Sequence, residues 1–191
     1  KMHDKDIVSW GAMISGYVQH GHIEEAVKFF HRMQLRALCP DIVTFLCTLK
    51  ACGNIGAAET GEKIHAEIVR EDLLKNDSVL GNAVVDMYAK CGLLIEAHRA
   101  LEKLLVKNVI SWNSVLSGHA QFGESENVFY NFDRMVREGV KPDCVTYIIL
   151  LNTCSRTGLF DRSQTYYDAM SKEHGLSPTL EHLTGMVGSL C

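Results

Sequence analysis

Apolar residues recur along this chain with the spacing of an α-helix, in segments separated by glycine. In the first segment they fall at positions i, i+3, i+4, i+7 and i+8, a spacing that puts them on one face of a helix. These residues are Trp10, Met13, Ile14, Tyr17 and Val18. Gly21 interrupts this stripe. A second stripe follows before Pro40 and consists of Ile23, Ala26, Val27, Phe30 and Met33. The pattern predicts two helices joined by a turn, which is a helical hairpin.

The same helix-break-helix pattern returns further along the chain, with breaks at Gly56, Gly92 and Gly123. Its apolar stripes are Phe45, Leu49, Ile64 and Ile68, then Ala83, Val84, Met87, Tyr88, Ala97 and Leu101, then Trp112, Val115, Leu116, Ala120, Val128, Phe132 and Met135. No segment has the alternating apolar and polar residues that favour a β-strand. The periodicity therefore predicts an all-α protein.

The chain also repeats itself at an offset of 102 residues. "DIVSWGAMISGYVQHG" begins at Asp6 and "NVISWNSVLSGHAQFG" at Asn108, while "CPDIVTF" and "KPDCVTY" share the same offset. Dividing the chain at Ile7, Ile42, Ser78, Val109 and Cys144 gives repeats of 35, 36, 31 and 35 residues before the fifth begins. One hairpin cannot bury its own apolar stripe, so neighbouring hairpins must stack into a solenoid.

Composition fits a folded protein and excludes several classes. The 191 residues are 47% hydrophobic and 22% charged, and no apolar run reaches the roughly 18 residues of a membrane span. Seven cysteines without a C-x-x-C pair argue against a disulfide framework or a zinc site, and we expect most of them to be small buried fillers. The start "KMHDKDIVSW" has no signal or transit peptide and no initiator Met, so we expect a piece of a longer protein. The net charge of −4 disfavours a strongly basic nucleic-acid surface.

Two families of helical hairpin repeat are compatible with these units. Part of the tetratricopeptide pattern is present at Trp10, Tyr17, Ala26 and Phe30, but Ile14 replaces its glycine. The unit lengths and four phrases instead resemble pentatricopeptide repeats of the plant subclass in which P, L and S units alternate: "VSWGAMISGYVQHGHIEEAVKFFHRM", "LKACGNIGAAETGEKIHAEIV", "GNAVVDMYAKCGLLIEA" and "VISWNSVLSGHAQFG". The resemblance covers essentially the whole chain and implies a right-handed superhelical solenoid. It divides the chain into the end of a preceding repeat (1–6), P (7–41), L (42–77), S (78–108), P (109–143), L (144–179) and a truncated final repeat (180–191).

The resemblance also implies a binding mode, in which the fifth and last residues of each repeat read one RNA base. The pairs are Gly11 with Asp41, Leu46 with Asp77, Asn82 with Asn108, Asn113 with Asp143, and Ile148 with Thr179. In the family's pattern Asn with Asp favours uridine, and Asn with Asn favours a pyrimidine, leaning to cytidine. Gly11 has no side chain to form a hydrogen bond, and we assign no base to the apolar Leu46 and Ile148.

Other positions leave a choice between RNA contact and structural roles. The apolar second residue of each repeat would flank the bases in this family, or else pack the helix start against the next hairpin: Val8, Val43, Val79, Ile110 and Val145. For Trp10 and Trp112 the helical spacing favours the core over base stacking. Asp41 and Asp143 follow proline directly and are candidate helix N-caps. Lys90 and Arg156 are the candidates for added positive charge along the first helices.

The resemblance implies a function in binding single-stranded organellar RNA, in a mitochondrion or chloroplast, and directing C-to-U editing. Editing factors or a deaminase acting in trans are the expected protein partners, and neither DNA, a membrane, a metal nor a cofactor is expected. The alternative is a tetratricopeptide-like scaffold whose groove binds a peptide. We expect no enzyme activity in this segment. His65-Ala66-Glu67 matches only half of a zinc deaminase signature, and Cys52 and Cys154 occupy positions where small side chains favour helix packing.

Overall fold

The computed structural model of the protein describes residues 6–75, 77–172 and 174–187, and every regular element in that part of the chain is a helix. The helices are α1 (Asp6–Gln19), α2 (Ile23–Leu35), α3 (Ile42–Ile55), α4 (Ala58–Arg70), α5 (Ser78–Lys90), α6 (Leu94–Lys103), α7 (Val109–Gln121), α8 (Ser125–Arg137), α9 (Cys144–Thr157), α10 (Phe160–Lys172) and α11 (Leu180–Val187), with a short 3-10 helix at Leu73–Lys75. They form an N-terminal unit, Lys1–Val106, and a C-terminal unit, Lys107–Cys191. The predicted segments 1–6 and 180–191 extend beyond the described residues.

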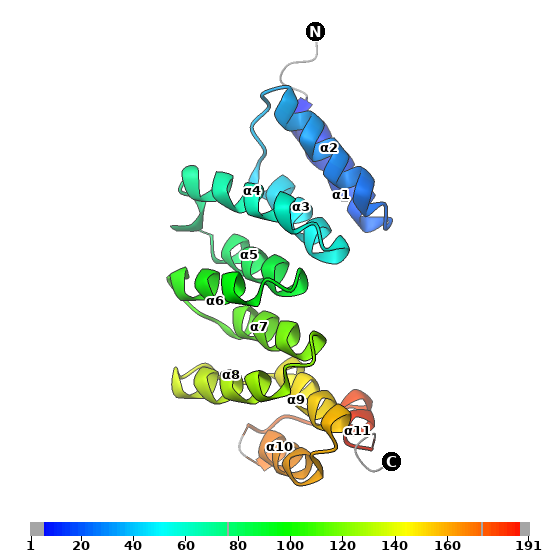
Figure 1. Ribbon diagram of the computed structural model, residues 1–191, viewed down its shortest axis with the longest axis vertical. Coiled ribbons are helices and arrows are strands. Elements are labelled where there is room, and N and C mark those ends of the chain that lie inside the picture. Colours follow the sequence, from blue (N-terminus) through cyan, green and yellow to red (C-terminus); the bar gives the residue numbers. More distant parts are fainter. Residues whose placement is uncertain (1–5, 76, 173, 188–191) are drawn as a thin grey trace. The chain divides into compact units, whose positions relative to one another are not determined.

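Helices pack in two layers within each unit. In the N-terminal unit the first helices of the hairpins follow one another, α1 on α3 and α3 on α5, while α2, α4 and α6 each pack on the helix before them (Figure 1). In the C-terminal unit α7, α9 and α11 form the corresponding row, and α8 and α10 pack beside α7 and α9. Below, the odd-numbered helices are called first helices and the even-numbered helices second helices.

Each hairpin turns at a glycine in the left-handed region of backbone conformation. The φ angle is +77° at Gly21, +69° at Gly56, +78° at Gly92, +77° at Gly123 and +68° at Gly158. A residue with a Cβ atom pays roughly 1–2 kcal/mol in this conformation, which is why glycine marks these turns. The breaks predicted from Gly21, Gly56, Gly92 and Gly123 are confirmed.

The predicted apolar stripes supply most of the core. Fully or almost fully buried are Ile14, Ala26, Val27, Phe30, Met33, Phe45, Leu49, Ile64, Ile68, Val84, Met87, Tyr88, Ala97, Leu101, Trp112, Val115, Leu116, Val128, Phe132 and Met135. The assignment of Met13 to the buried face is wrong, because its side chain is 45% exposed.

Both tryptophans lie between the helices of a hairpin. Trp112 is fully buried, and the guanidinium of Arg134 lies 5.3 Å from the centre of its ring. Trp10 is half-buried, with the ring of Phe29 at 5.4 Å and the guanidinium of Arg36 at 5.2 Å. The preference for a core role over base stacking is confirmed for Trp112, and Trp10 occupies the equivalent place.

Side-chain caps begin the first helices α3, α5, α7 and α9, whereas the second helices α2, α4, α6 and α8 lack them. The carboxylate of Asp41 accepts a hydrogen bond from Thr44 N at 2.8 Å, and that of Asp143 accepts from Thr146 N at 2.9 Å, so both predicted N-caps are confirmed. Asp77 and Asn108 cap α5 and α7 in the same way. The residues before α2, α4, α6 and α8 make no side-chain cap bond. Caps of this kind contribute about 1 kcal/mol each, so the start of each capped helix is fixed more firmly than the start of its partner.

A buried histidine fastens α11 to the rest of the C-terminal unit. His182 is fully buried, and its Nδ1 accepts a hydrogen bond from Thr179 N at 3.1 Å. Its Nε2 donates to the carbonyl oxygen of Cys144 at 3.0 Å, at the start of α9. Because one ring nitrogen accepts and the other donates, this arrangement requires the neutral ring with its proton on Nε2.

Replacing His182 by alanine should therefore loosen α11. The change leaves the Thr179 amide and the Cys144 carbonyl without this partner, at a cost of about 1–3 kcal/mol. Hydrogen exchange of the α11 amides should accelerate in His182→Ala. Leu183→Ala, on the same helix but at an exposed position, should have a much smaller effect, and equal exchange in the two variants would contradict this role of His182.

Candidate nucleic-acid interface

Asn113, Asp143 and Thr146 form a hydrogen-bonded cluster between α7 and α9. Asn113 Nδ2 donates to Asp143 Oδ1 at 3.0 Å, across 30 residues of sequence. The Thr146 hydroxyl lies 2.7 Å from Asn113 Oδ1 and 3.0 Å from Asp143 Oδ1. Asn113 is 9% exposed and Asp143 is half-buried. The structure thus brings together the two residues of this predicted reading pair, at the junction of two hairpins.

Hydrogen bonds keep the Asp143 carboxylate charged. Burial by itself would raise the pKa of Asp143, but donors from the backbone of Thr146, the Asn113 amide, the Thr146 hydroxyl and the backbone of Val145 hold that pKa below its ordinary value of 3.8. The bonds from Thr146 N and Asn113 both end on Oδ1. The other oxygen, Oδ2, has two lone pairs, so the charged group has the capacity to accept a further hydrogen bond from a ligand.

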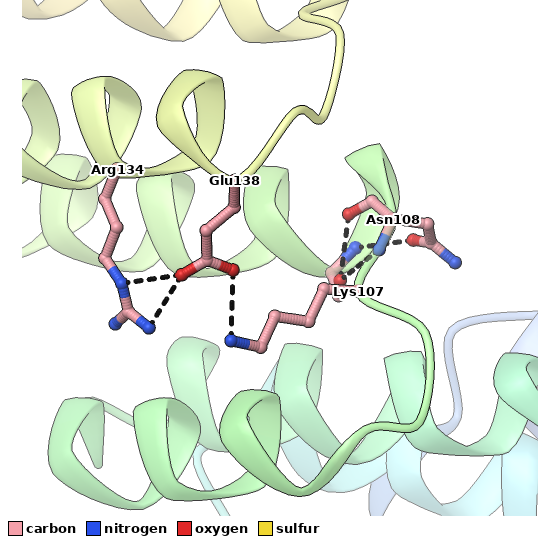
Figure 2. A network of polar contacts seen from close by, with 5 residues as sticks. Lys107, Asn108, Arg134 and Glu138 are labelled. Atoms are coloured by element: carbon pink, nitrogen blue, oxygen red, sulfur yellow. Dashed lines mark hydrogen bonds and ion pairs between the residues drawn. The ribbon is translucent and has the colours of Figure 1, made fainter.

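The cap residue Asn108 has a different free group. Its Oδ1 accepts from Ser111 N at 3.0 Å, and its own backbone N–H donates to Ser111 Oγ at 3.1 Å, which completes a capping box (Figure 2). Because Oδ1 is used by the cap, the Nδ2 group is the part of this amide that remains for a ligand. Asn108 thus offers hydrogen-bond donors where Asp143 offers an acceptor.

An ion-pair network holds the residue before this cap. Lys107 Nζ lies 3.0 Å from Glu138 Oε2, and Arg134 approaches Glu138 Oε1 at 2.9–3.0 Å (Figure 2). All three side chains are at least two-thirds buried, and Arg134 also covers the ring of Trp112. The network connects the segment leading into α7 with the end of α8, and so restrains the backbone at Asn108.

The first repeat has the same junction without the reading side chain. Asp41 and Thr44 correspond to Asp143 and Thr146 at the 102-residue offset, and Thr44 Oγ1 donates to Asp41 Oδ1 at 2.6 Å. Gly11 stands where the later repeat has Asn113. A Cβ atom added at Gly11 would lie only 2.8 Å from Thr44 Oγ1, so a side chain requires a shift of its surroundings. Here the structure places Gly11 in a tight helix contact beside an exposed Asp41.

The remaining predicted pairs are less fully defined. Asn82, on α5, is 7% exposed, and its Oδ1 has no hydrogen-bond partner in the described part of the chain. It lies in the N-terminal unit, and its predicted partner Asn108 lies in the C-terminal unit. Leu46 is half-buried on α3, and Asp77 serves as the cap of α5. Ile148 is half-buried on α9 and Thr179 is exposed.

The second residue of every repeat is exposed. The exposed fractions are 73% for Val8, 56% for Val43, 60% for Val79, 60% for Ile110 and 51% for Val145. The larger part of each of these residues is therefore accessible to a ligand, and the smaller part is covered by the protein. Val43, Val79, Ile110 and Val145 each lie two residues after a cap, so an apolar side chain accompanies the polar groups at these four junctions.

The two candidate basic residues already have protein partners. Lys90 Nζ pairs with Asp86 Oδ2 at 2.7 Å, and Arg156 donates to the carbonyl oxygen of Ala120 at the end of α7. Arg156 also borders a polar hollow of about 420 Å³ between α7 and α9, together with Ser117, Ala120, Gln121, Ile149, Asn152 and Ser155. Sequence reasoning did not identify this hollow, because its hydroxyl and amide side chains come from two repeats.

Sequence reasoning also missed Thr44, Ser111 and Thr146. Each is three residues after an aspartate or asparagine cap, and this spacing was a usable signal. A Ser or Thr at the third residue of a helix can complete a capping box with the cap. The structure places Thr44, Ser111 and Thr146 in contact with the cap residues that the sequence assigned to base reading.

The half deaminase signature has an ordinary packing explanation. His65 Nδ1 lies 2.9 Å from the Tyr88 hydroxyl, whereas Glu67 accepts from Gln34 Nε2 at 2.8 Å, so the two residues have different partners. Burial raises the pKa of the Cys52 thiol to about 12 and that of Cys154 to about 11, which disfavours the nucleophilic thiolate. In the described residues no three potential metal ligands lie together, and no helix there has the length and apolar character of a membrane span.

A second concavity lies on the side of the second helices in the C-terminal unit. It has a volume of about 680 Å³ between α8 and α10, and its lining includes Tyr130, Phe132, Val136, Tyr147, Tyr166 and Ala169. At the equivalent place in the N-terminal unit, Gln34 and Glu67 form a hydrogen bond between α2 and α4. Val136 and Ala169 replace that polar pair at the 102-residue offset, so the later groove is apolar and aromatic.

Comparison with known proteins identifies the class. The sequence profile of the PPR repeat family matches residues 5–54 and 107–156, and that of the PPR repeat matches residues 82–109 and 145–174. A mitochondrial pentatricopeptide repeat-containing protein of Arabidopsis thaliana is 37% identical over 183 residues, which are 96% of this chain and 20% of that relative. The chain spans between 20% and 37% of the length of the curated relatives that it matches.

Solved structures agree on the fold. The crystal structure of the pentatricopeptide repeat protein PPR10 from maize has a TM-score of 0.69 at 24% identity, over 95% of this chain and 26% of that one. PPR10 in complex with an 18-nucleotide psaJ RNA element gives 0.71 at 22% identity, over 88% of this chain and 25% of that one. This protein therefore belongs to the pentatricopeptide (PPR) repeat family. The predicted fold class, an all-α solenoid of helix-turn-helix repeats, is confirmed.

His65 should make the stability of the N-terminal unit depend on pH. Burial lowers the pKa of His65 from its ordinary 6.5, and the positive charge of Lys103 lowers it further. The unfolded chain therefore binds this proton more readily than the folded chain. The contribution of the neutral His65 ring to the free energy of unfolding is complete above pH 6.5. It is lost as the pH falls toward the folded-state pKa of His65.

Urea unfolding of the wild type and His65→Gln at pH 7.5 and pH 5.5 would measure this effect. The difference in the free energy of unfolding between the two proteins at pH 7.5 gives the cost of losing the neutral His65 ring. The wild type should lose more stability than the variant between the two pH values. An equal loss in both proteins would exclude His65 as the source.

Proposed function

We propose that this chain binds single-stranded RNA, with one base facing the fifth and last residues of a repeat. The contact between Asn113 and Asp143 carries the proposal. It places an amide and a charged carboxylate, 30 residues apart in sequence, at one junction of the first helices. The fold shared with a maize protein that was crystallised in complex with an 18-nucleotide RNA supports RNA as the class of ligand.

The free hydrogen-bonding groups explain how the reading pairs differ. Asp143 Oδ2 is an acceptor, and the second Nδ2 hydrogen of Asn113 is a donor without a partner among the described residues. Uracil presents an N3–H donor beside carbonyl acceptors and complements this combination. At Asn108 the cap engages Oδ1 and leaves the Nδ2 group as a donor, and cytosine presents two adjacent acceptors, N3 and O2. We therefore assign uridine to Asn113 with Asp143, and a pyrimidine, cytidine or uridine, to Asn108.

Apolar contact complements these polar pairs. Val79 and Ile110 are each 60% exposed next to the helix starts that carry the caps. An exposed β-branched side chain in that place can cover the face of an unstacked base and shield its hydrogen bonds from water. Equivalent valines at 8, 43 and 145 extend the same arrangement to the other repeats. Gly11 supplies no such polar partner, and Asp41 contributes its carboxylate alone.

Electrostatic attraction contributes little to this binding. The net charge is −4, and both Lys90 and Arg156 are engaged by protein groups. Affinity must then come from several bases read along the first helices. Binding with few phosphate contacts has a shallow dependence on salt concentration, so we expect that behaviour here.

The wider role that we propose is organellar RNA processing, most specifically the recognition of C-to-U editing sites. A relative named as mitochondrial supports an organelle, although mitochondrion and chloroplast are both compatible with this chain. The P, L and S assignment of the repeats belongs to the same proposal. A deaminase or other editing factor would act from another part of the protein or in trans, and the residues of this chain recognise the RNA.

The aromatic groove between α8 and α10 favours peptide binding as a second candidate function. Its volume of about 680 Å³ is in the range of ligand pockets, and its rings provide a large apolar surface. The nearby Asp133 and Arg137 offer charges of both signs. The fitting occupant is a peptide that inserts an apolar side chain and meets these charges with its own polar groups.

The RNA proposal is tested by changing Asn113 to threonine. Loss of the amide donor, with Asp143 retained, should move the preference at one RNA position from U toward G, because guanine presents N1–H and N2–H donors to a carboxylate. Binding to a randomised RNA library, with sequencing of the bound fraction, measures this preference. Asn127→Thr, on second helix α8, is the matched control and should leave the profile unchanged. The same profile for wild type and Asn113→Thr would refute the reading pair.

The second candidate is tested by filling the groove. Val136→Arg should abolish enrichment of apolar peptides from a displayed peptide library, whereas Gln34→Arg, at the equivalent place in the N-terminal unit, should not. Both variants should bind RNA as the wild type does. Absence of peptide enrichment by the wild type would count against this function and leave the RNA proposal intact.

A further inference from the structure

We propose that Thr146 is a positioning residue that determines which hydrogen-bonding group Asn113 presents to its base. The inference rests on the proposed function of Asn113 and Asp143 as a reading pair. Thr146 is fully buried, so it does not meet RNA itself. It belongs to α9, the first helix of the following hairpin, and acts through the amide of α7.

The hydrogen bonds of Thr146 define its role. Its Oγ1 accepts from Asp143 N at 3.2 Å and lies 2.7 Å from Asn113 Oδ1. A hydroxyl has one proton to donate, and the alternative acceptor, Asp143 Oδ1, is farther away at 3.0 Å. That carboxylate oxygen already accepts from Thr146 N and Asn113 Nδ2. Donation to Asn113 Oδ1 therefore satisfies every one of these atoms.

This bond fixes the orientation of the Asn113 amide. With Oδ1 held by the Thr146 hydroxyl and Nδ2 held by the Asp143 carboxylate, the free group is the second N–H. Without the hydroxyl, Oδ1 would be left in a buried place with no donor. The amide would then be held by the Asp143 carboxylate alone, so it could turn about that one bond and bring its oxygen as well as its nitrogen within reach of a base. Thr146 thus makes Asn113 a donor rather than a group that accepts and donates.

The chain contains its own comparison for this role. Thr44 corresponds to Thr146, is fully buried, and bonds to Asp41 through both its backbone N–H and its hydroxyl. Gly11 replaces Asn113 there, so Thr44 caps a helix without an amide to orient. Thr146 therefore both supports a cap and orients an amide, whereas Thr44 only supports a cap.

Two substitutions exploit this difference. Thr146→Val and Thr44→Val both remove one buried hydroxyl beside an aspartate cap and keep a similar shape. Thermal unfolding should show a loss of stability in both variants, with the larger loss in Thr146→Val, which also leaves Asn113 Oδ1 without its donor. Thr146→Ser retains the hydroxyl and should behave as the wild type in base preference.

The experiment is selection of the 191-residue chain against a randomised single-stranded RNA library, with Asn113→Thr marking the RNA position that this pair reads. At that position Thr146→Val should reduce the preference for U over the other bases about fivefold to tenfold, as expected for one lost hydrogen bond. Preferences at all other positions should persist. Thr44→Val and Thr146→Ser should keep the wild-type profile throughout.

The outcomes separate the two proposals. A wild type without base preference at any position would overturn the reading pair and the role of Thr146 with it. A wild type that responds to Asn113→Thr but not to Thr146→Val would leave the reading pair standing and overturn the role of Thr146. Uniform weakening at all positions in Thr146→Val, matched by Thr44→Val, would show a purely structural hydroxyl and would overturn it as well.

Discussion

The N-termini of the first helices impose the constraint on which this structure depends. A helix start leaves backbone N–H groups without partners, and at a junction between stacked hairpins part of that backbone is removed from water. Asp41, Asp77, Asn108 and Asp143 each satisfy such groups with a side-chain oxygen. The last residue of a repeat must therefore be polar for structural reasons. The proposed reading of RNA uses the atoms of these side chains that capping leaves over.

Capping also gives the reading residues a defined chemistry. An asparagine is ambiguous in solution, since its two ends differ only in whether they accept or donate. Once Oδ1 of Asn108 accepts the hydrogen bond from Ser111 N, the Nδ2 group remains as the donor for a ligand. Once Nδ2 of Asn113 donates to Asp143 and its Oδ1 accepts from the Thr146 hydroxyl, the orientation of that amide is set too. Specificity at each junction is then a property of the hydrogen-bonded cluster rather than of one side chain.

The repetition at 102 residues shows how one backbone supports different chemistry. The first and fourth repeats share their cap and hydroxyl, yet Gly11 closes the junction that Asn113 occupies in the later repeat. On the second helices, Gln34 and Glu67 form a hydrogen bond in the N-terminal unit. At the equivalent positions of the C-terminal unit, Val136 and Ala169 line an aromatic groove. These exchanges keep helix spacing and turn glycines while changing what the surfaces contact.

The sequence by itself determined the helices, the glycine turns, the 102-residue repetition and most of the core, because these follow from spacing along the chain. The caps Asp41 and Asp143 were equally predictable, since a cap acts on residues two and three positions away. Tertiary structure decided the exposure of Met13, the partners of Lys90 and Arg156, and the contact of Thr146 with Asn113. Each of these depends on which neighbouring helix covers a side chain. That depends on packing between residues distant in sequence, and periodicity within a single helix carries no information about it.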